Sequence, residues 1–197
     1  MSYRVEHKFR LTHAEALQMR SELIAQGMAP LFPARRIESI YFDNRVFGMF
    51  VDSEEGSLPR KKIRLRHYPE AGSACSLEIK VSSIEGRFKT TRELIADEAR
   101  AMLETGITDP QYGLCKPCLV IAYDREYFEH RGVRVTFDSD IRYSRYNSAT
   151  VRREFECVAE IKAPIDTPQD LLADLIPGGR ARFSKYGRAA SRLLLAA

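Results

Sequence analysis

The stretch Lys62-Ile63-Arg64-Leu65-Arg66 alternates basic and aliphatic residues with a period of two. Successive side chains of a β-strand point to opposite faces, so this segment would present one apolar face and one ionic face. Leu77-Glu78-Ile79-Lys80-Val81 repeats the pattern, and further copies lie at residues 4–10 and 154–162. If these strands share a sheet, their ionic faces coincide. The result would be a surface suited to a polyanion, with carboxylates among the bases as candidate metal ligands.

The composition is that of an ordinary globular protein. The 197 residues are 44% hydrophobic and 29% charged, and we expect one domain over residues 1–197. The net charge of +4 is too small to indicate nucleic-acid binding by itself. No apolar run approaches the roughly 20 residues that a membrane span needs, and we recognise no signal or transit peptide. A cytoplasmic location is therefore predicted.

The cysteines do not indicate a metal or redox centre. Cys115 and Cys118 have CxxC spacing, but no second Cys or His pair accompanies them, so a structural zinc site is not expected. A strand-like run follows them, whereas a redox pair would start a helix. Reduced thiols are the expected state.

About eight segments have strand character, and helical segments lie between or after them. Strands are expected at residues 3–10, 36–43, 60–68, 76–81, 87–95, 119–129, 133–143 and 154–162. Helices are expected from a capping box at Thr12 and Glu15 to Ala25, and then at 96–103, 168–175 and 184–195. Leu17, Leu23 and Ile24 would form the apolar side of the first helix. This pattern favours an α+β fold, an antiparallel barrel or sandwich with helices added.

The alternation alone leaves open which strand face lies inside. In a sandwich the charged faces would be solvated. In a closed barrel the apolar faces could instead pack outward against helices, and the ionic faces would line a water-filled bore. The mixture of both charge signs on single strand faces, with Arg prominent, favours the bore.

Eight short motifs occur in order along nearly the whole chain. They are Glu6-His7-Lys8, Ser39-Ile40-Tyr41-Phe42-Asp43, Arg64-Leu65-Arg66, Glu78-Ile79-Lys80, Tyr123-Asp124-Arg125, Arg134-Val135-Thr136-Phe137-Asp138, Glu160-Ile161-Lys162 and Arg182-Phe183-Ser184-Lys185-Tyr186. In this set the chain resembles the triphosphate tunnel metalloenzymes, and within them the VTC (vacuolar transporter chaperone) polyphosphate polymerase domain. The resemblance implies an eight-stranded antiparallel β-barrel with helices packed outside. Its bore would bind a triphosphate.

The resemblance also implies which bases hold phosphate oxygens. Arg can bind two oxygens at once, and phosphoryl transfer needs alignment and charge neutralisation more than a side-chain nucleophile. The other interpretation is that these bases are solvated or paired with carboxylates. The expected phosphate-binding residues are Lys8, Arg64, Arg66, Lys80, Arg92, Arg134, Arg182 and Lys185, with Lys89 as the alternative to Arg92. All except Arg92 and Arg182 are also predicted to be catalytic.

Glu160 matches the metal carboxylate of the family, and the expected ion is Mn²⁺ or Mg²⁺. Glu6, Glu78 and Glu156 are further candidate ligands, each of which could instead balance a neighbouring base.

The implied activity is polyphosphate synthesis, in which the terminal phosphate of ATP passes to a growing chain. An inorganic triphosphatase and a non-catalytic polyphosphate sensor are the alternatives. Nucleic acid is not expected as a partner, because the chain lacks Trp and its carboxylates would repel a phosphate backbone. A membrane partner and the oligomeric state are left open.

Overall fold

The computed structural model describes residues 4–72, 74–175 and 183–194, which divide into two compact units. Unit 1 comprises Met1–Arg35, Tyr123–Ile141 and Arg153–Phe183. Unit 2 comprises Arg36–Ala122, Arg142–Arg152 and Ser184–Ala197. Residue 182, one of the predicted phosphate-binding arginines, lies outside the described residues.

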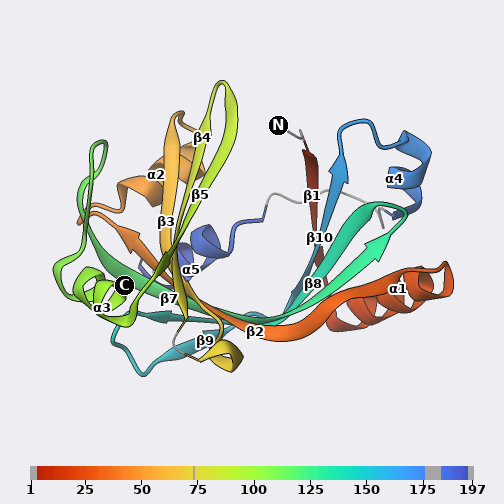
Figure 1. Ribbon diagram of the computed structural model, residues 1–197, viewed down its shortest axis with the longest axis horizontal. Helices are drawn as coiled ribbons and strands as arrows, with labels where there is room; N and C mark the ends of the chain where they lie inside the picture. The colour runs from red at the N-terminus through yellow and green to blue at the C-terminus, as the bar shows by residue number, and fades with distance from the viewer. Residues whose placement is uncertain (1–3, 73, 176–182, 195–197) are drawn as a thin grey trace. The chain divides into compact units, whose positions relative to one another are not determined.

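The described residues form ten strands (Figure 1). Eight of them follow the order β1-β10-β8-β7-β2-β3-β4-β5, while β6 pairs with β7 and β9 pairs with β8. The strand pairs whose register is defined are antiparallel. The strands are β1 Arg4–Leu11, β2 Ala29–Asp43, β3 Arg60–His67, β4 Cys75–Ser83, β5 Gly86–Leu94, β6 Ile107–Asp109, β7 Gly113–His130, β8 Val133–Arg145, β9 Val151–Arg153 and β10 Cys157–Pro164.

The start of the strand differs most from its predicted position in β2, β7 and β10. β2 begins at Ala29, seven residues before the predicted start at Arg36, and contains Pro30 and Pro33. β7 begins at Gly113, so the CxxC pair lies within it. β10 begins only at Cys157, and the predicted strand start at residues 154–156 precedes it. The alternation at 154–156 therefore does not place side chains on the ionic face of this strand.

Two helices, α1 and α5, begin directly after a residue that caps them. Thr12 Oγ1 accepts a hydrogen bond from the Glu15 backbone N at 3.2 Å, and Glu15 Oε2 accepts one from the Thr12 backbone N at 2.7 Å. Ser184 caps the last helix by accepting from the Gly187 N at 3.1 Å. The helices are α1 His13–Ala25, α2 Gly48–Glu55, α3 Ala96–Thr105, α4 Gln169–Leu175 and α5 Lys185–Leu193, with a 3₁₀ turn at Pro69–Ala71. None of them has the length and apolar character needed to span a membrane.

In unit 1 the apolar faces of β1, β8 and β10 pack against α1 and α4. Phe9, Val135 and Ile161 are strand members of this core, which also contains buried residues of both helices. The predicted apolar side of α1 is only partly correct. Leu23 is buried, but Leu17 and Ile24 are exposed, and Ala16 and Met19 take their place in the core.

In unit 2 the apolar residues of the alternating stretches pack against α2 and α3. Ile63 and Leu65 are buried in this core, and Leu77 and Ile79 pack against it. The opposite face of the same strands is ionic but little exposed, because the side chains of Arg64 and Arg66 are only 11% and 9% accessible. Helices α1 and α4 in unit 1, and α2 and α3 in unit 2, therefore cover the apolar side of the strands, and the ionic residues lie on the other face.

Candidate functional site

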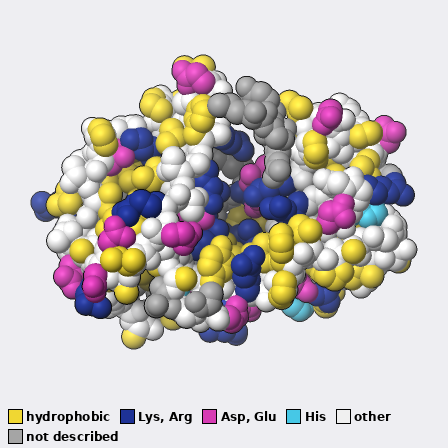
Figure 2. All heavy atoms as spheres, viewed as in Figure 1, with side chains coloured by type: hydrophobic (Ala, Val, Ile, Leu, Met, Phe, Trp, Pro, Cys, Tyr) yellow, Lys and Arg dark blue, Asp and Glu magenta, His cyan; other side chains and the backbone are white. Residues whose placement is uncertain are grey.

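In unit 2 the strand register aligns the ionic residues of β3, β4 and β5. Lys62 pairs with Lys80, and Lys80 pairs with Lys89. Directly opposed residues of antiparallel strands share one face, so three ammonium groups form a row there. Such a row is repulsive unless negative charge lies close to it. Figure 2 shows acidic side chains lying among the Lys and Arg side chains on the face that it presents.

The neighbouring row contains the carboxylate of Glu78, which is 3% exposed. Arg64 Nε donates to Glu78 Oε2 at 2.8 Å, and Lys89 Nζ donates to Oε1 at 2.7 Å. Arg66 Nη1 lies 3.5 Å from Oε1. Burial would raise the pKa of the Glu78 carboxyl, but Arg64 and Arg66 lower it to about 2. Glu78 is therefore a fixed anion at the centre of three bases.

Two tyrosines lie beside this cluster, and Tyr41 is opposite Arg64 in register on the same face. Tyr41 Oη accepts a hydrogen bond from Arg64 Nη1 at 2.7 Å. The Tyr41 ring stacks on the Tyr186 ring with centroids 5.0 Å apart. The Tyr186 hydroxyl donates to Asp43 Oδ2, and Asp43 also accepts from the backbone N–H groups of Met49 and Phe50 at 3.0 Å. The end of β2 thus holds both α2 and α5 beside the basic strands.

The first turn of α5 also contacts the basic face. Lys62 Nζ donates to the Ser184 Oγ at 2.9 Å. Lys185 follows as the first helical residue and is half-buried. Ser184 contacts Lys62 of β3, and Tyr186 stacks on Tyr41 of β2, the strand next to β3, so α5 brings this predicted base to the same region of unit 2.

In unit 1 a second ionic cluster joins β1, β10 and β8. Lys8 pairs in register with Glu160, and Glu6 pairs with Lys162. Lys8 Nζ lies 2.8 Å from Glu6 Oε1 and 3.8 Å from Glu160 Oε2, and Lys162 Nζ lies 2.7 Å from Glu160 Oε1. Burial and the Glu160 carboxylate act to raise the pKa of Glu6, but Lys8 and Lys162 lower it below its ordinary value. The two carboxylates are therefore near neighbours held ionised by lysines.

Glu160 is the more buried of these two carboxylates. Burial would raise its pKa, but Lys8, Lys162 and Arg125 together lower it far below the ordinary value. Thr136 lies opposite Glu160 in register, and its buried hydroxyl has no hydrogen-bond partner in the described part of the chain. A buried polar atom of this kind is uncommon and is often explained by a ligand or water.

Two further bases of unit 1, Arg134 and Arg125, lie on β8 and β7. Arg134 pairs in register with Lys162, and its guanidinium lies 6.0 Å from the Phe32 ring centroid. Arg125 is almost buried and donates through Nη2 to Asp138 Oδ2 at 2.7 Å. Burial would lower the pKa of Arg125, but Asp138 raises it well above the ordinary value.

Two of the predicted site residues lie apart from these clusters. Arg92 pairs in register with Leu77, on the apolar face of β4, and its Nη1 lies 2.7 Å from Glu98 Oε1. Glu156 precedes β10 and bonds Arg10, with Nη2 and Oε1 2.6 Å apart. The structure brings together in unit 2 Arg64, Arg66, Lys80, Glu78 and the alternative base Lys89, and in unit 1 Lys8, Glu6, Glu160 and Arg134.

Several members of the two clusters were not among the predicted site residues. Lys62 precedes Arg64 by two positions and Lys162 follows Glu160 by two, so the same alternation that indicated their neighbours could have found them. Asp138 is four residues from Arg134 on β8, so the two side chains lie on the same face of that strand. No sequence signal that we recognise indicates that Tyr41 would bond Arg64.

The sequence and the fold were compared with those of known proteins. A scan against protein-family profiles matches residues 3–194 to the VTC domain. A search of curated proteins found no match.

Among solved structures, a candidate adenylate cyclase from Bacillus halodurans has a TM-score of 0.66 at 13% identity, covering 95% of this chain and 97% of that one. A candidate adenylate cyclase from Vibrio parahaemolyticus gives 0.59 at 18% identity, with coverages of 96% and 98%. A candidate adenylyl cyclase from Hippeastrum, described as having a dominant triphosphatase activity, gives 0.61 at 15% identity, with 98% of both chains covered. These likenesses confirm the predicted fold class, an antiparallel sheet with helices of the triphosphate tunnel type.

Proposed function

Because the chain belongs to the VTC domain family, we propose that it binds triphosphate or polyphosphate and transfers a phosphoryl group with the aid of a divalent metal. The observation that carries this proposal is the excess of bases around Glu78. One carboxylate faces Arg64, Arg66 and Lys89, and the row of lysines beside it adds more positive charge. A face on which so many basic side chains gather is suited to a multiply charged phosphate chain.

The basic face of unit 2 is suited to holding the phosphates still. Arg64 is already fixed by Glu78 and Tyr41, so little side-chain entropy would be lost when phosphate binds. Its guanidinium can bind two phosphate oxygens at once, whereas the lysines act as point charges. We assign phosphate binding to Arg64, Arg66, Lys80, Lys89 and Lys185 in this unit, and to Lys8 and Arg134 in unit 1.

The carboxylates of unit 1 are suited to a divalent metal. No group of three or more His, Cys, Asp or Glu side chains that could hold a metal occurs among the described residues. Mg²⁺, however, commonly uses one or two carboxylates, with water and substrate phosphate completing its shell. Glu6 and Glu160 are adjacent and ionised, and the buried Thr136 hydroxyl beside Glu160 is without a partner in the described chain. We therefore propose Glu160 and Glu6 as the residues that would hold Mg²⁺ or Mn²⁺.

The metal, when bound, would neutralise charge on the phosphate oxygens. The protein's own bases would align the phosphate chain and stabilise the charge that develops on the transferred group and the leaving group. No side-chain nucleophile is required. Glu78 and Glu156 are weaker candidates as metal ligands, because each already lies against basic side chains.

The proposed reaction is polyphosphate synthesis from ATP. A phosphate chain end is an ionised acceptor that needs no base, whereas attack by water is assisted by one. An efficient general base has a pKa near the working pH, but the pKa of Glu78 is about 2 and that of Glu160 is strongly lowered. Triphosphate hydrolysis is the second candidate, favoured by the activity described for the Hippeastrum protein.

The experiment that tests this function is incubation of the protein with ATP and Mn²⁺, followed by separation of the products on a polyacrylamide gel. Long polyphosphate chains are expected. Orthophosphate alone would instead establish a hydrolase. Absence of turnover, together with tight binding of tripolyphosphate, would establish a sensor and contradict the proposed catalysis.

A further inference from the structure

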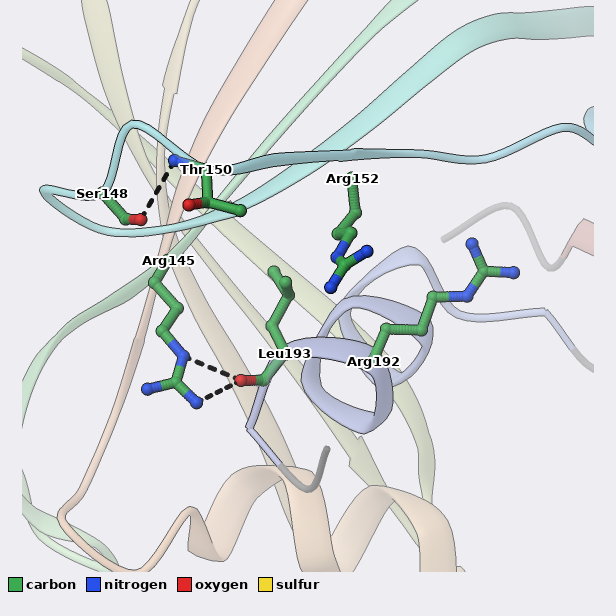
Figure 3. A pocket seen from close by; sticks show the side chains of 6 residues that line it. All are labelled: Arg145, Ser148, Thr150, Arg152, Arg192 and Leu193. Atoms are coloured by element: carbon green, nitrogen blue, oxygen red, sulfur yellow. Dashed lines mark hydrogen bonds between the residues drawn. The ribbon is translucent and has the colours of Figure 1, made fainter. Parts of the chain in front are cut away.

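A second cationic pocket lies in unit 2 at the far end of α5 from Ser184. It has a volume of about 220 Å³ and is lined by the end of β8, the turn that follows, β9 and the last turn of α5. Figure 3 shows the side chain of Arg152 extending from β9 toward α5. The lining residues are Arg145, Ser148, Thr150, Arg152, Arg192 and Leu193.

The polar side chains of this pocket can all donate hydrogen bonds. Three are guanidinium groups and two are hydroxyls, and none of the described lining residues is a carboxylate. The Ser148 Oγ accepts from the Thr150 backbone N at 3.2 Å, which leaves the Ser148 hydroxyl proton available to another acceptor. A pocket that presents several donors and cations to one volume is suited to an oxyanion.

Two of the three arginines of this pocket differ from many others in the described part of the protein. Neither Arg145 nor Arg152 makes a salt bridge with a described carboxylate. Elsewhere in the described residues, eight arginines each lie within 4 Å of an acidic side chain, namely Arg10, Arg20, Arg64, Arg66, Arg92, Arg100, Arg125 and Arg153. The positive charges of Arg145 and Arg152, which line the same pocket, repel one another, and a bound anion would relieve that repulsion.

The positions of Arg145 and Arg192 are explained by the C-terminal end of α5. Arg145 donates through Nε to the Leu193 carbonyl at 2.7 Å, and Arg192 lies in the last turn of α5. Both positions complement the negative end of the helix dipole. Arg152 has no such role, because it lies on β9 and is exposed. Arg152 is therefore the residue that distinguishes an anion site from the stabilisation of a helix end.

We propose that this pocket binds a small inorganic oxyanion of the phosphate or pyrophosphate class. Its volume of about 220 Å³ is below the roughly 300–1,000 Å³ typical of pockets that enclose drug-sized ligands, which favours an inorganic ion over a nucleotide. The pocket contains none of the residues assigned to phosphoryl transfer, so the two proposals stand independently.

The first test is calorimetric titration of inorganic pyrophosphate into the full chain carrying Arg64→Ala, which weakens the proposed phosphoryl-transfer site. One pyrophosphate per chain is expected, and adding Arg152→Ala should weaken it about tenfold, as loss of one charge-assisted hydrogen bond predicts. Arg153→Ala is the matched control, because Arg153 is the next residue on β9 and bonds Asp140 at 2.9 Å. Equal weakening by both changes would overturn the site.

A second measurement uses the wild-type chain and so does not depend on the folding of any variant. Pyrophosphate should slow the reaction of phenylglyoxal with Arg145 and Arg152 several-fold, as located by mass spectrometry, and should leave Arg153 unchanged. Equal rates with and without pyrophosphate would overturn the proposal. Tripolyphosphate binding by Arg152→Ala at its wild-type affinity would show that the proposed phosphoryl-transfer site is unaffected.

Discussion

The ionic clusters of the two units are built from the same alternating pattern but differ in charge balance. In unit 1, Glu6 and Glu160 face Lys8 and Lys162, so carboxylates and ammonium groups alternate in both rows. In unit 2, Glu78 is surrounded by Arg64, Arg66 and Lys89, and the next row consists of lysines alone.

This difference decides what each cluster can accept. Adjacent carboxylates, as in unit 1, are the ligands that a divalent cation prefers, whereas a face rich in Arg and Lys, as in unit 2, is suited to an anion. We therefore assign the metal to unit 1 and most of the phosphate contacts to unit 2. Removal of a carboxylate should therefore impair function in unit 1 but strengthen phosphate binding in unit 2.

The largest effect is expected from Glu160→Gln in unit 1. Loss of the proposed metal carboxylate should lower turnover on the order of 10²- to 10³-fold, since removal of a single stabilising group at a reacting centre costs that much. Steady-state assays over a range of Mn²⁺ concentrations will measure the loss and the shift in metal requirement. Glu156→Gln is the matched control, because Glu156 bonds Arg10 and precedes β10. Equal losses in both variants would contradict the assignment.

In unit 2, Arg64→Ala should weaken tripolyphosphate binding by about 100-fold, the upper range for loss of a hydrogen bond to a charged group. Calorimetric titration of tripolyphosphate provides the measurement. The control is Arg92→Ala, which removes the same type of side chain from β5, on the opposite face of the same sheet. Similar losses of affinity in Arg64→Ala and Arg92→Ala would mean that tripolyphosphate does not bind preferentially to the ionic face.

Glu78→Gln should change the affinity for tripolyphosphate in the opposite direction. Removal of this anion leaves its three bases available, so tripolyphosphate should bind about tenfold more tightly, whereas the free protein becomes less stable. Glu85→Gln, in the turn between β4 and β5, is the charge-matched control. Weaker binding by Glu78→Gln would show that Glu78 positions the phosphate rather than competing with it.

The same carboxylate predicts how stability depends on pH. The pKa of Glu78 falls from an ordinary 4.5 to about 2 in the folded protein. Its contribution is therefore fully present above pH 4.5 and is lost as the pH falls toward 2. Urea unfolding between pH 6 and pH 3 should show a steeper loss for the wild type than for Glu78→Gln. Parallel curves would contradict the ionic pairing.

The sequence predicts the two faces of the strands well because alternation is a local property. Ile63 and Leu65 are buried in the helix-covered core and Arg64 lies on the other face, as the period of two requires. The choice between Arg92 and Lys89 depends instead on register, which the turn between β4 and β5 sets. That register places Lys89 opposite Lys80 and Arg92 opposite Leu77. A shift of one residue would exchange their faces, and the short motif contains no information about it.

Other features depend on contacts between distant parts of the sequence. The bond between Tyr186 and Asp43, which fixes α5 beside β2, joins residues far apart in the chain and has no local signature. The assignment of Arg182 stays a prediction, since that residue lies outside the described part of the structure.

The smallest effect is expected from Tyr41→Phe, which tests whether the hydrogen bond from Arg64 to the Tyr41 hydroxyl orients the Arg64 guanidinium. The change keeps the ring that stacks on Tyr186 and removes only the oxygen that accepts from Arg64 at 2.7 Å. Tripolyphosphate affinity should fall about three- to fivefold, because Arg64 keeps its bond to Glu78 but is less firmly oriented. Titration calorimetry will measure it, and Tyr112→Phe, which loses a hydroxyl bond to Asp52 at 2.6 Å, is the control.

A double-mutant cycle separates this positioning role from a direct contact with phosphate. If Tyr41 acts only through Arg64, then Tyr41→Phe should have no further effect on affinity in the Arg64→Ala background. If the two losses add instead, the Tyr41 hydroxyl must contact the ligand or stabilise another base, and the proposed support of Arg64 by Tyr41 would be wrong. Because the rings of Tyr41 and Tyr186 remain stacked in each variant, the cycle reports on the hydroxyl alone.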